Sequence, residues 1–591
     1  MSKRIQYDDW SKEDLIKELH RIKETRYGLV WHRDLPEDKI DILINPDAST
    51  PNEMFPNIMS GKPFPILREE KDNSILVEKN KPTNILIEGD NYHSLAVLNF
   101  THQEMVDVIY IDPPYNTGNN DFKYNDKFVD SEDPYKHSKW LSFMEKRLKL
   151  AKKLLKDSGV IYISIDDNEQ AQLKLLCDEI FGDKNLIAII PRLTKKGGKS
   201  AENISKNHDY VLIYQKSDKA KLNRLEHTDE GFKYEDKHVK ERGLYKLNQT
   251  LDYDSIQYSP SLDYVINIEG EELIPGGVSK NDMEIRKKNN PDRDFCWRWS
   301  KKLFDFGLKN DFIVLKKYTD RPSRIYTKTY QNATISEDEN GDYFVEIVPR
   351  AKPLSSIDLM DNRFSNDSAK KELKMIFGKV VFDYPKPTEL IKEILKISTT
   401  PNSIILDFMA GSGTTGQAVL ELNQIDGGNR KFILCTNNEN NICTEICLPR
   451  LSKIINGFKN FKNEKILGIP ANLNYYTCDF VEAEPTDKNK RKLVNESTEM
   501  LCLKEDAFEL VDDTVDFKIY KNKNNYVGII FYEEAIDAFK ERIQNINGQF
   551  NVYVFSLGDD PHQQEFLDLR GKVSLKAIPE VILKVYREIF K

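Results

Sequence analysis

The chain has 591 residues, 39% of them hydrophobic and 10% aromatic, which excludes a disordered protein and exceeds the usual size of one domain. A net charge of −9 gives no chain-wide signature of a polyanion-binding protein, so any nucleic-acid-binding face must be local. Seven irregularly spaced cysteines, no apolar N-terminal leader and no membrane-length apolar run predict a cytoplasmic protein with no membrane segment and no metal site.

Residues 1–65 are predicted to form an N-terminal helical and irregular segment. Ser11 suits the N-cap position and acidic residues follow it, so we expect a helix from Ser11 to Trp31. The stretch 46–65 is rich in Pro and Asn, which indicates an irregular connector.

Residues 66–191 alternate between strand-like and helix-like patterns. "NILIEGDN" (from Asn84) and "VIYID" (from Val108) are apolar runs that stop at carboxylates. An amphipathic helix is expected from Lys139 to Gly159, followed by the strand "VIYISID". This alternation predicts an α/β fold with a doubly wound, mostly parallel sheet.

The alternation stops and later resumes. Short aromatic strands, turns and lysines in 192–365 predict an inserted domain. The α/β pattern returns in 366–465 with "FDYPKP", "SIILDFMAGSGTTGQAVLEL" and "KFILCTNNEN". Residues 466–591 are expected to form a small C-terminal α/β domain, with a strand, a helix and a strand in "NYVGIIFYEEAIDAFKERIQNINGQFNVYVFSL" and a last helix that runs to Lys591.

A glycine-rich turn follows the predicted strand that ends at Asp407. "GSGTTG", from Gly411 to Gly416, satisfies G-x-G-x-x-G, and a helix is expected to start near Thr414. Such a turn lets the backbone approach a ligand beside a positive helix N-terminus. A nicotinamide-dinucleotide site is the rival interpretation, but it requires an acidic residue after the next strand, which here ends in Thr436-Asn437-Asn438.

A second motif, Asp112-Pro113-Pro114-Tyr115, follows another predicted parallel strand, where open α/β sheets bind ligands. Prolines lack a backbone N–H and stiffen the chain, so this turn can hold acceptors rigidly. The Asp112 carboxylate and the Pro113 carbonyl could accept both protons of an exocyclic amine, and Tyr115 could stack on an extracted base. These features favour amine methylation in DNA, by direct transfer that depends on positioning and electrostatics.

The order "IEGDN", "IYIDPPYNTG" and, much later, "FDYPKP" and "LDFMAGSGTTG" resembles the β-class amino-methyltransferases of DNA. More narrowly, "IYIDPPYNTGNNDFKYND", "WRWS", "LDFMAGSGTTGQAVLELN" and "FILCTNNENN" are similar to the modification (Mod) subunits of type III restriction–modification systems. The resemblance implies the S-adenosylmethionine-dependent methyltransferase fold, split into a catalytic half (66–191) and a cofactor half (366–465). It also implies transfer of a methyl group from S-adenosyl-L-methionine to N6 of adenine in a short asymmetric DNA site after base flipping.

The resemblance also implies roles for individual residues. Those implied to handle the target base are Asp112, Pro113, Pro114 and Tyr115. Those implied to surround S-adenosyl-L-methionine are Asp90, Asn116, Lys386, Pro387, Asp407, Phe408, Ala410, Gly411, Gly413, Thr414 and Asn437. Relatives often place a Glu where this chain has Thr436, so Asn437, Asn438 or Glu439 is expected to take over the ribose contact.

The inserted segment 192–365 is the expected target-recognition (DNA-binding) domain. From residue 286 to 328 it holds thirteen Lys or Arg against five Asp or Glu, interleaved with aromatic residues, which suits phosphate contacts and base stacking. The alternative is a solvated face over a small core. The candidate DNA-binding residues are Arg293, Trp297, Arg298, Trp299, Lys301 and Lys302.

Several alternatives remain open at this point. Cytosine-N4 methylation uses the same kind of amine, and only the Asp at position 112 favours adenine. A solitary methyltransferase without a restriction partner is a further possibility; RNA or protein methylation, a dehydrogenase and a non-catalytic DNA-binding module fit the motifs less well.

The expected partners are double-stranded DNA and other protein chains. The sequence contains no G-x-x-x-x-G-K-[ST] loop and no nuclease motif, so DNA cleavage would belong to a separate restriction (Res) helicase/nuclease subunit. The resemblance implies a homodimer, with 466–591 as the expected dimerisation or partner domain.

Overall fold

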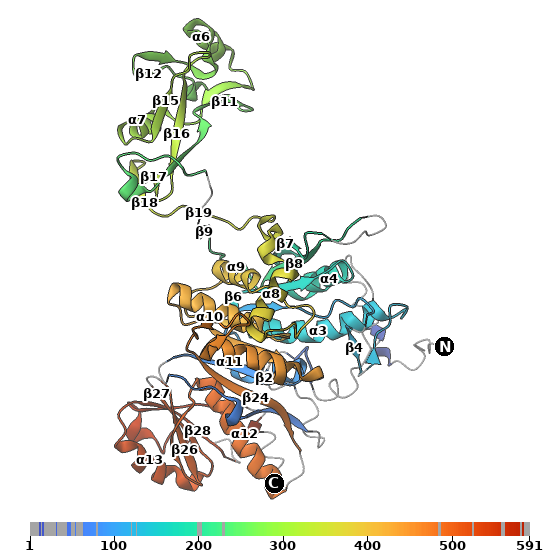
Figure 1. The fold of residues 1–591 in the computed structure, drawn as a ribbon. Helices are drawn as coiled ribbons and strands as arrows, with labels where there is room; N and C mark the ends of the chain where they lie inside the picture. Colours follow the sequence, from blue (N-terminus) through green and yellow to red (C-terminus); the bar gives the residue numbers. More distant parts are fainter. Residues whose placement is uncertain are drawn as a thin grey trace. The chain divides into compact units, whose positions relative to one another are not determined.

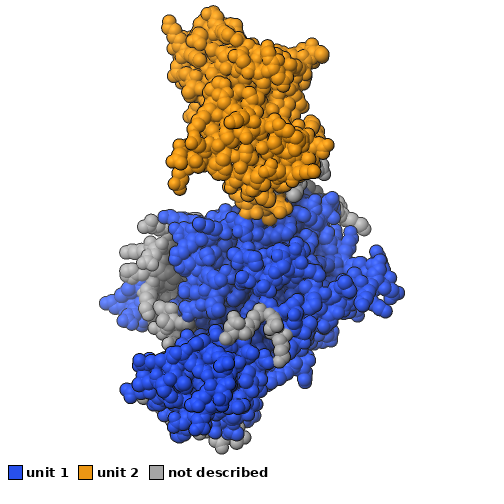
Figure 2. Space-filling view, turned by 90° about the vertical axis from the view of Figure 1, so that its left-hand side faces the viewer, with its two compact units in different colours: residues 1–223, 355–591 blue, residues 224–354 orange. Residues whose placement is uncertain are grey.

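The computed structural model describes residues 11–13, 15–16, 31, 44–48, 54, 63–78, 81–119, 121–125, 127–197, 204–226, 231–482, 486–522, 525–556, 562–579 and 582–583. The helix predicted from Ser11 to Trp31 and the last helix predicted up to Lys591 lie largely outside these residues. The chain divides into two compact units, 1–223 with 355–591, and 224–354 (Figure 2).

A nine-stranded sheet forms the centre of the first unit, among the described residues (Figure 1). In spatial order its strands are β1 (Phe64–Glu69), β24 (Asn472–Val481), β2 (Thr83–Glu88), β21 (Lys431–Thr436), β20 (Ile404–Asp407), β3 (Val106–Ile111), β6 (Leu155–Ile165), β8 (His208–Gln215) and β7 (Leu186–Leu193). The strands from β24 to β6 are parallel to one another, and β1, β8 and β7 pair antiparallel. The predicted doubly wound, mostly parallel α/β sheet is confirmed.

The chain reverses its winding direction between β3 and β20. From β3 it continues through a helix to β6, whereas from β20 it continues through a helix to β21 on the other side. The two strands lie next to each other, with Ile405 opposite Val108 and Leu406 opposite Ile109. The loops that leave their carboxyl ends therefore open a crevice, the usual ligand position in such sheets.

Two groups of contacting helices flank the sheet. The first holds α2 (Asn91–Thr101), α3 (Lys136–Leu154), α4 (Gln170–Phe181) and α12 (Asp487–Glu505); the second holds α8 (Asn366–Phe377), α9 (Thr388–Ser398), α10 (Thr414–Asp426) and α11 (Leu448–Asn456). The predicted start of α10 at Thr414 is confirmed.

The predicted end of α3 at Gly159 is wrong. The helix ends at Leu154, and β6 begins at Leu155. Leu155 is fully buried and pairs with Val106 of β3, so a long-range strand contact overrides the helical pattern of 155–158.

The second unit, 224–354, contains small antiparallel sheets around its own core. Its main elements are β9 (Leu225–Glu226), α5 (Val239–Arg242), β10 (Tyr245–Thr250), β11 (Asp252–Ser255), β12 (Ile266–Ile268), β13 (Glu271–Leu273), α6 (Lys280–Asn289), β14 (Asp294–Trp297), α7 (Lys301–Lys309), β15 (Ile313–Lys316), β16 (Arg324–Tyr330), β17 (Ala333–Glu337), β18 (Tyr343–Ile347) and β19 (Ala351–Lys352). Its first and last strands, β9 and β19, pair with each other. The unit is narrower than the predicted segment 192–365, because β7 and β8 belong to the central sheet.

The C-terminal part adds a smaller five-stranded sheet (Figure 1). Its elements are β25 (Glu509–Asp513), β26 (Phe517–Lys521), β27 (Asn525–Ile530), α13 (Ile536–Gln544), β28 (Gln549–Val554) and β29 (Val573–Leu575). The predicted strand, helix and strand correspond to β27, α13 and β28, whereas β24 (472–481) joins the central sheet. None of the helices in the described part of the chain has the length and apolarity of a membrane span.

Two carboxyls of α12 lie on a helix that contacts β1 and β24 of the central sheet and β27 of the smaller sheet; Glu496 is buried and Glu499 half-buried. Burial raises the pKa of Glu499 to about 8 and that of Glu496 to about 7. Glu499 Oε2 accepts a hydrogen bond of 2.6 Å from the backbone N–H of Glu69, an acceptor role that an amide oxygen can keep.

We expect Glu499→Gln to reduce the dependence of stability on pH. An ordinary Glu titrates near 4.5, so the folded protein loses stability as the pH rises from there until the buried carboxyl ionises near 8. Urea unfolding should therefore give the variant a higher free energy of unfolding than the wild type, by on the order of 1–3 kcal/mol at alkaline pH and by little near pH 5. An equal difference at both pH values would contradict this expectation.

Candidate functional site

Asp112, at the carboxyl end of β3, is joined to a residue from the far half of the chain. Lys386 Nζ donates to Asp112 Oδ1 at 2.6 Å, and Lys386 precedes α9. The lysine side chain is 8% exposed and the aspartate 25%, so one face of the carboxylate stays accessible. The ion pair thereby joins the two motifs that the sequence separates.

The two prolines after Asp112 present their carbonyls differently. Trp140 Nε1 of α3 donates to the Pro114 carbonyl at 2.7 Å, and the Trp140 side chain is fully buried. In the described part of the chain, the Pro113 carbonyl accepts no hydrogen bond. The residue directly after Asp112 therefore keeps a carbonyl that no donor of the described residues uses, and the acceptor pair stays a prediction.

Tyr115 contacts a carboxylate through its hydroxyl and an ammonium group through its ring. Its hydroxyl donates to Asp209 Oδ2 at 3.1 Å, and Lys386 Nζ lies 4.8 Å from its ring centroid. Burial, together with the nearby Asp112 and Asp209, raises the pKa of Tyr115, so the phenol remains neutral. Its ring orientation is therefore fixed by a carboxylate on β8.

Asp209 is itself part of a buried ion pair with Arg192 of β7. Arg192 Nε donates to Asp209 Oδ1 at 2.7 Å, and the exposed fractions of the two residues are 0% and 2%. The guanidinium also donates to the Phe364 carbonyl at 2.8 Å and to Asn366 Oδ1 at 3.0 Å. This pair links Tyr115 to the start of α8.

Asn116 lies behind the turn, buried and with a positive φ of 56°. Its Nδ2 donates to Glu169 Oε1 at 2.5 Å and to the Lys136 carbonyl at 3.2 Å. His137 Nδ1 lies 2.7 Å from the same Glu169 oxygen. Asn116 thus anchors the turn to the N-terminal side of α3 and to Glu169.

The glycine-rich turn is shaped by positive φ angles and by Asp407. Gly411 and Gly413 have φ of 50° and 78°, and a Cβ on Gly413 would lie 2.9 Å from Cys447 Sγ. Asp407 accepts hydrogen bonds from the Met409 N–H at 3.0 Å and from Thr415 Oγ1 at 2.5 Å. Burial raises the pKa of Asp407 to about 7.

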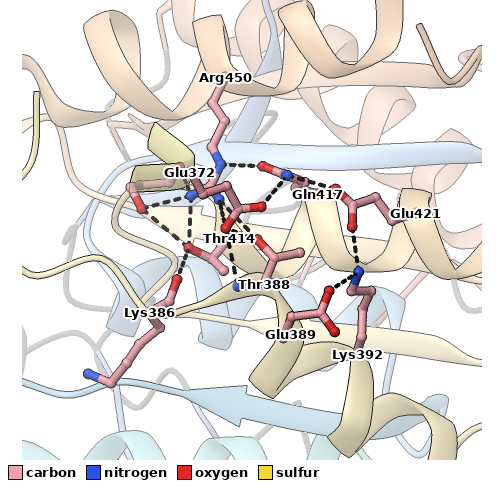
Figure 3. A network of polar contacts seen from close by, with 10 residues as sticks. Glu372, Lys386, Thr388, Glu389, Lys392, Thr414, Gln417, Glu421 and Arg450 are labelled. Atoms are coloured by element: carbon pink, nitrogen blue, oxygen red, sulfur yellow. Dashed lines mark hydrogen bonds and ion pairs between the residues drawn. The ribbon is translucent and has the colours of Figure 1, made fainter. Parts of the chain in front are cut away.

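A fully buried arginine, Arg450 of α11, holds the glycine-rich turn from behind (Figure 3). Its Nε donates to Gln417 Oε1 at 2.7 Å, and its terminal nitrogens donate to Thr414 Oγ1 at 2.8 Å, Ser412 Oγ at 3.1 Å and Thr388 Oγ1 at 3.3 Å. One planar guanidinium therefore positions both the turn and the start of α9.

The Arg450 network continues in two directions (Figure 3). Thr414 Oγ1 donates to the Lys386 carbonyl at 3.2 Å, which connects Arg450 to the residue that contacts Asp112. On the other side, Glu372 of α8 accepts from Gln417 Nε2 at 2.6 Å and from Thr388 Oγ1 at 2.7 Å. The network thus joins α8, α9, α10 and α11 around the turn.

A cavity of about 430 Å³ opens beside these two turns. Its walls come from the loops after β2, β3, β20 and β21 and from α3, and consist of Asp90, Asn91, Pro114, Asp121, Phe122, Lys123, Phe128, Phe143, Phe408, Met409, Gly411, Thr436, Asn437, Glu439, Asn440 and Ile442. Such a volume, with aromatic walls and a few carboxylates, suits a nucleoside-sized ligand.

The predicted ligand-binding residues divide into two groups around this cavity. Asp90, Phe408, Gly411 and Asn437 line it, whereas Asn116, Lys386, Pro387, Asp407, Ala410, Gly413 and Thr414 are not among the lining residues. Most of the second group support the two turns through the hydrogen bonds described above.

The loop after β21 supplies further polar residues of the cavity wall, beside the loop that carries Asp90. Thr436, Asn437 and Glu439 line the cavity, and Glu439 forms an ion pair with Lys123 from the segment that follows Tyr115. Asn438 does not line the cavity. Its Oδ1 accepts hydrogen bonds from the backbone N–H groups of Cys443 and Thr444, each at 3.1 Å. Glu439 is thus the carboxylate on this wall.

The predicted DNA-binding residues lie in the second unit, and several have internal partners. Trp297 is 3% exposed and donates from Nε1 to the Tyr264 carbonyl at 2.7 Å, while Trp299 packs over Gly307. Trp297 belongs to the core of the unit, whereas Trp299 is half-buried and packs against that core.

The predicted DNA-binding cations are at the surface. Arg293 pairs with Asp254 at 2.5 Å, Lys301 with Asp305 at 2.5 Å and Lys302 with Asp342 at 3.0 Å. Arg298 lies 4.2 Å from the ring of Tyr253.

The structure adds supporting residues that the sequence interpretation missed. They are Trp140, Glu169, Arg192, Asp209 and Arg450. A charged residue inside an apolar strand, such as Arg192 in "IIPRL", is a signal of a buried partner, but the sequence does not identify that partner.

A family model described as DNA methylase (N6_N4_Mtase) matches residues 106–446, more than half of the chain. This chain belongs to that DNA methylase family. The match spans both turns and the unit inserted between them.

Relatives of this DNA methylase include both type III and type II proteins. The type III restriction-modification enzyme EcoPI Mod subunit of Escherichia phage P1 is 33% identical, over 64% of this chain and 61% of that protein. The StyLTI Mod subunit of Salmonella typhimurium is 33% identical, over 64% of this chain and 55% of that protein. The type II methyltransferase M.KpnI of Klebsiella pneumoniae is 34% identical, over 64% of this chain and 89% of that protein. The match thus spans less than two thirds of the two Mod subunits.

Proposed function

We propose that this chain is a site-specific DNA methyltransferase that transfers a methyl group from S-adenosyl-L-methionine to N6 of adenine in a short asymmetric site. The observation that carries the proposal is the position of the Asp112 carboxylate and the unused Pro113 carbonyl at the crevice between β3 and β20, beside the 430 Å³ cavity. Membership of the DNA methylase family supports the reaction class.

The chain's own residues can activate an exocyclic amine. The amine lone pair of adenine is delocalised into the ring, so the amine needs acceptors that pull its protons out of the ring plane. Asp112 and Pro113 supply two acceptors in a stiff turn, and Lys386 keeps the carboxylate in place at 2.6 Å. Tyr115, fixed by Asp209, offers a neutral aromatic face for an extracted base.

The cavity residues fit S-adenosyl-L-methionine, which when bound supplies an electrophilic methyl group. Gly411 brings the backbone to the cavity wall without a side chain, and Phe143 and Phe408 offer apolar surfaces for an adenine ring. Asp90 and Glu439 provide carboxylates for hydroxyl or amino groups.

We expect Glu439→Gln to weaken S-adenosyl-L-methionine binding about tenfold, because a charged acceptor on the cavity wall is lost. Calorimetric titration measures this, and Glu445→Gln serves as the control, because Glu445 is an exposed carboxylate of the same segment that does not line the cavity. Equal affinities for Glu439→Gln and the wild type would assign the ribose contact to another residue.

The partners follow from the relatives. We infer that the chain acts on double-stranded DNA as the modification and recognition subunit of a type III system, with a Res subunit, because two Mod subunits are 33% identical to it. The homodimer that the sequence resemblance implies stays a prediction. A methyltransferase that acts without a Res subunit is the second candidate, because the match covers 89% of the type II methyltransferase M.KpnI.

The deciding experiment is long-read modification sequencing of DNA from cells that express this chain, with Asp112→Ala as the control. N6-methyladenine on one strand of an asymmetric motif, absent in the variant, is the expected result. A palindromic motif methylated on both strands would favour the solitary enzyme. N4-methylcytosine would change the assigned base, and a mark that persists in the variant would refute the assigned role of Asp112.

A further inference from the structure

A row of cations and tyrosines lies on the outward face of the three-stranded sheet formed by β10, β16 and β15. Arg324 and Tyr326 of β16 alternate with Ile325, which is 2% exposed and belongs to the core. Arg324 lies directly opposite Lys316 of β15, so both point away from that core. Tyr318 and Arg321 in the connecting loop extend the row, here termed the β15–β16 stripe: Lys316, Tyr318, Arg321, Arg324 and Tyr326.

The cations of the stripe differ in their pairing from Lys317, Arg293, Lys301 and Lys302 of the same unit. Among the described residues, no carboxylate lies within 4.0 Å of the cationic groups of Lys316, Arg321 or Arg324. The neighbouring Lys317, by contrast, pairs with Glu269 at 3.3 Å. The stripe therefore keeps its positive charge for an external anion, with Asp320 as the acid of the same loop.

The two tyrosines contact two of these cations and each other. The Arg321 guanidinium lies 3.8 Å from the Tyr318 ring centroid, and Lys316 Nζ lies 5.4 Å from the Tyr326 ring centroid. The two phenol oxygens are 3.2 Å apart. Stacking restricts the long side chains, so less conformational entropy is lost when they bind a ligand.

We propose that the β15–β16 stripe is the surface on which this unit binds the phosphate backbone of duplex DNA. The inference rests on the proposed function and goes beyond it by assigning the phosphate contacts to Lys316, Arg321 and Arg324. Lys316, Arg321 and Arg324 place three cations without a carboxylate partner in one strand pair and its connecting loop, which suits contacts to backbone phosphates. Arg293, Lys301 and Lys302 are already neutralised by Asp254, Asp305 and Asp342, so they contribute less.

The test compares two double variants of the full chain by fluorescence anisotropy with a labelled mixed-sequence DNA duplex. We expect Arg321→Ala/Arg324→Ala to weaken binding roughly 10- to 50-fold near 150 mM salt and to reduce the log–log salt slope by about 2. Lys301→Ala/Lys302→Ala, which removes paired cations, should change affinity by less than about threefold. Arg321→Lys/Arg324→Lys should restore the slope, because it keeps both charges.

Each other outcome overturns the assignment. If Arg321→Ala/Arg324→Ala binds the duplex with the affinity and the salt slope of the wild type, the stripe does not contact phosphates. A larger loss in Lys301→Ala/Lys302→Ala would place the backbone at α7 instead. If the wild type itself does not bind the duplex, the proposed function is overturned together with this inference. That measurement does not depend on either variant. A melting temperature measured for each variant ensures that a loss of binding is not a loss of fold.

Discussion

Replacing Asp112 with asparagine is expected to slow methyl transfer about 100- to 1,000-fold while leaving S-adenosyl-L-methionine affinity within about threefold. The carboxylate is the charged member of the acceptor pair, and Asn substitutes a neutral amide at the same position. Asp112 is not among the residues that line the 430 Å³ cavity, so ligand binding should be spared. Single-turnover methylation of duplex DNA and calorimetry separate the two quantities.

Asp121→Asn is the matched control for Asp112→Asn. Its carboxylate does line the cavity, and it accepts a 3.0 Å hydrogen bond from the Thr117 N–H. We expect this control to leave the single-turnover rate within a few-fold of the wild type. Equal rates for Asp112→Asn and the wild type would remove Asp112 from the chemistry.

Replacing Arg450 with methionine is expected to lower the free energy of unfolding by about 3–5 kcal/mol. The arginine is fully buried, and its loss leaves acceptors on Gln417, Ser412 and Thr388 without their donor. Urea unfolding measures the change. We also expect weaker S-adenosyl-L-methionine binding, because the guanidinium holds the turn that contains Gly411.

Glu389→Gln is the control for Arg450→Met. Gln417 also donates to Glu421 at 2.7 Å, and Glu421 pairs with Lys392 at 2.8 Å, so Glu389, which pairs with Lys392 at 2.5 Å, lies at the outer end of the network (Figure 3). Glu389 is 42% exposed, so its loss should cost less than about 1 kcal/mol. Arg450→Lys should not restore stability, because one ammonium cannot reproduce the planar fork. Wild-type stability in Arg450→Met would show that the network is dispensable.

The sequence predicted the central sheet well because each parallel strand carries its own signal. The apolar runs before Asp112 and Asp407 end at carboxylates, and the turns after them have unusual compositions. The start of α10 at Thr414 followed from the glycines before it. The end of α3 was wrong because Leu155 is placed by Val106, a contact that no local pattern encodes.

The supports of the site could not be predicted in the same way. Tyr115 and Asp209 are 94 positions apart, and Lys386 and Asp112 are 274 positions apart. Nor does a basic and aromatic segment reveal which rings are buried. Trp297 is in the core because β14 pairs with β11, whereas Tyr326 faces outward because Ile325 takes the inward position on β16.

The pairing of β9 with β19 has a consequence for how proteins of this design diversify. Ala351 lies opposite Glu226 and Lys352 opposite Leu225, so the chain enters and leaves the 224–354 unit through one antiparallel strand pair. Because its entry and exit are adjacent and lie outside the nine-stranded sheet, we expect such a unit to be replaceable by another inserted unit without a change in the register of that sheet. Under the DNA-binding role proposed for this unit, we expect recombination at the two-residue ladder to change which sites are recognised, while the residues around Asp112 and Gly411 stay as they are.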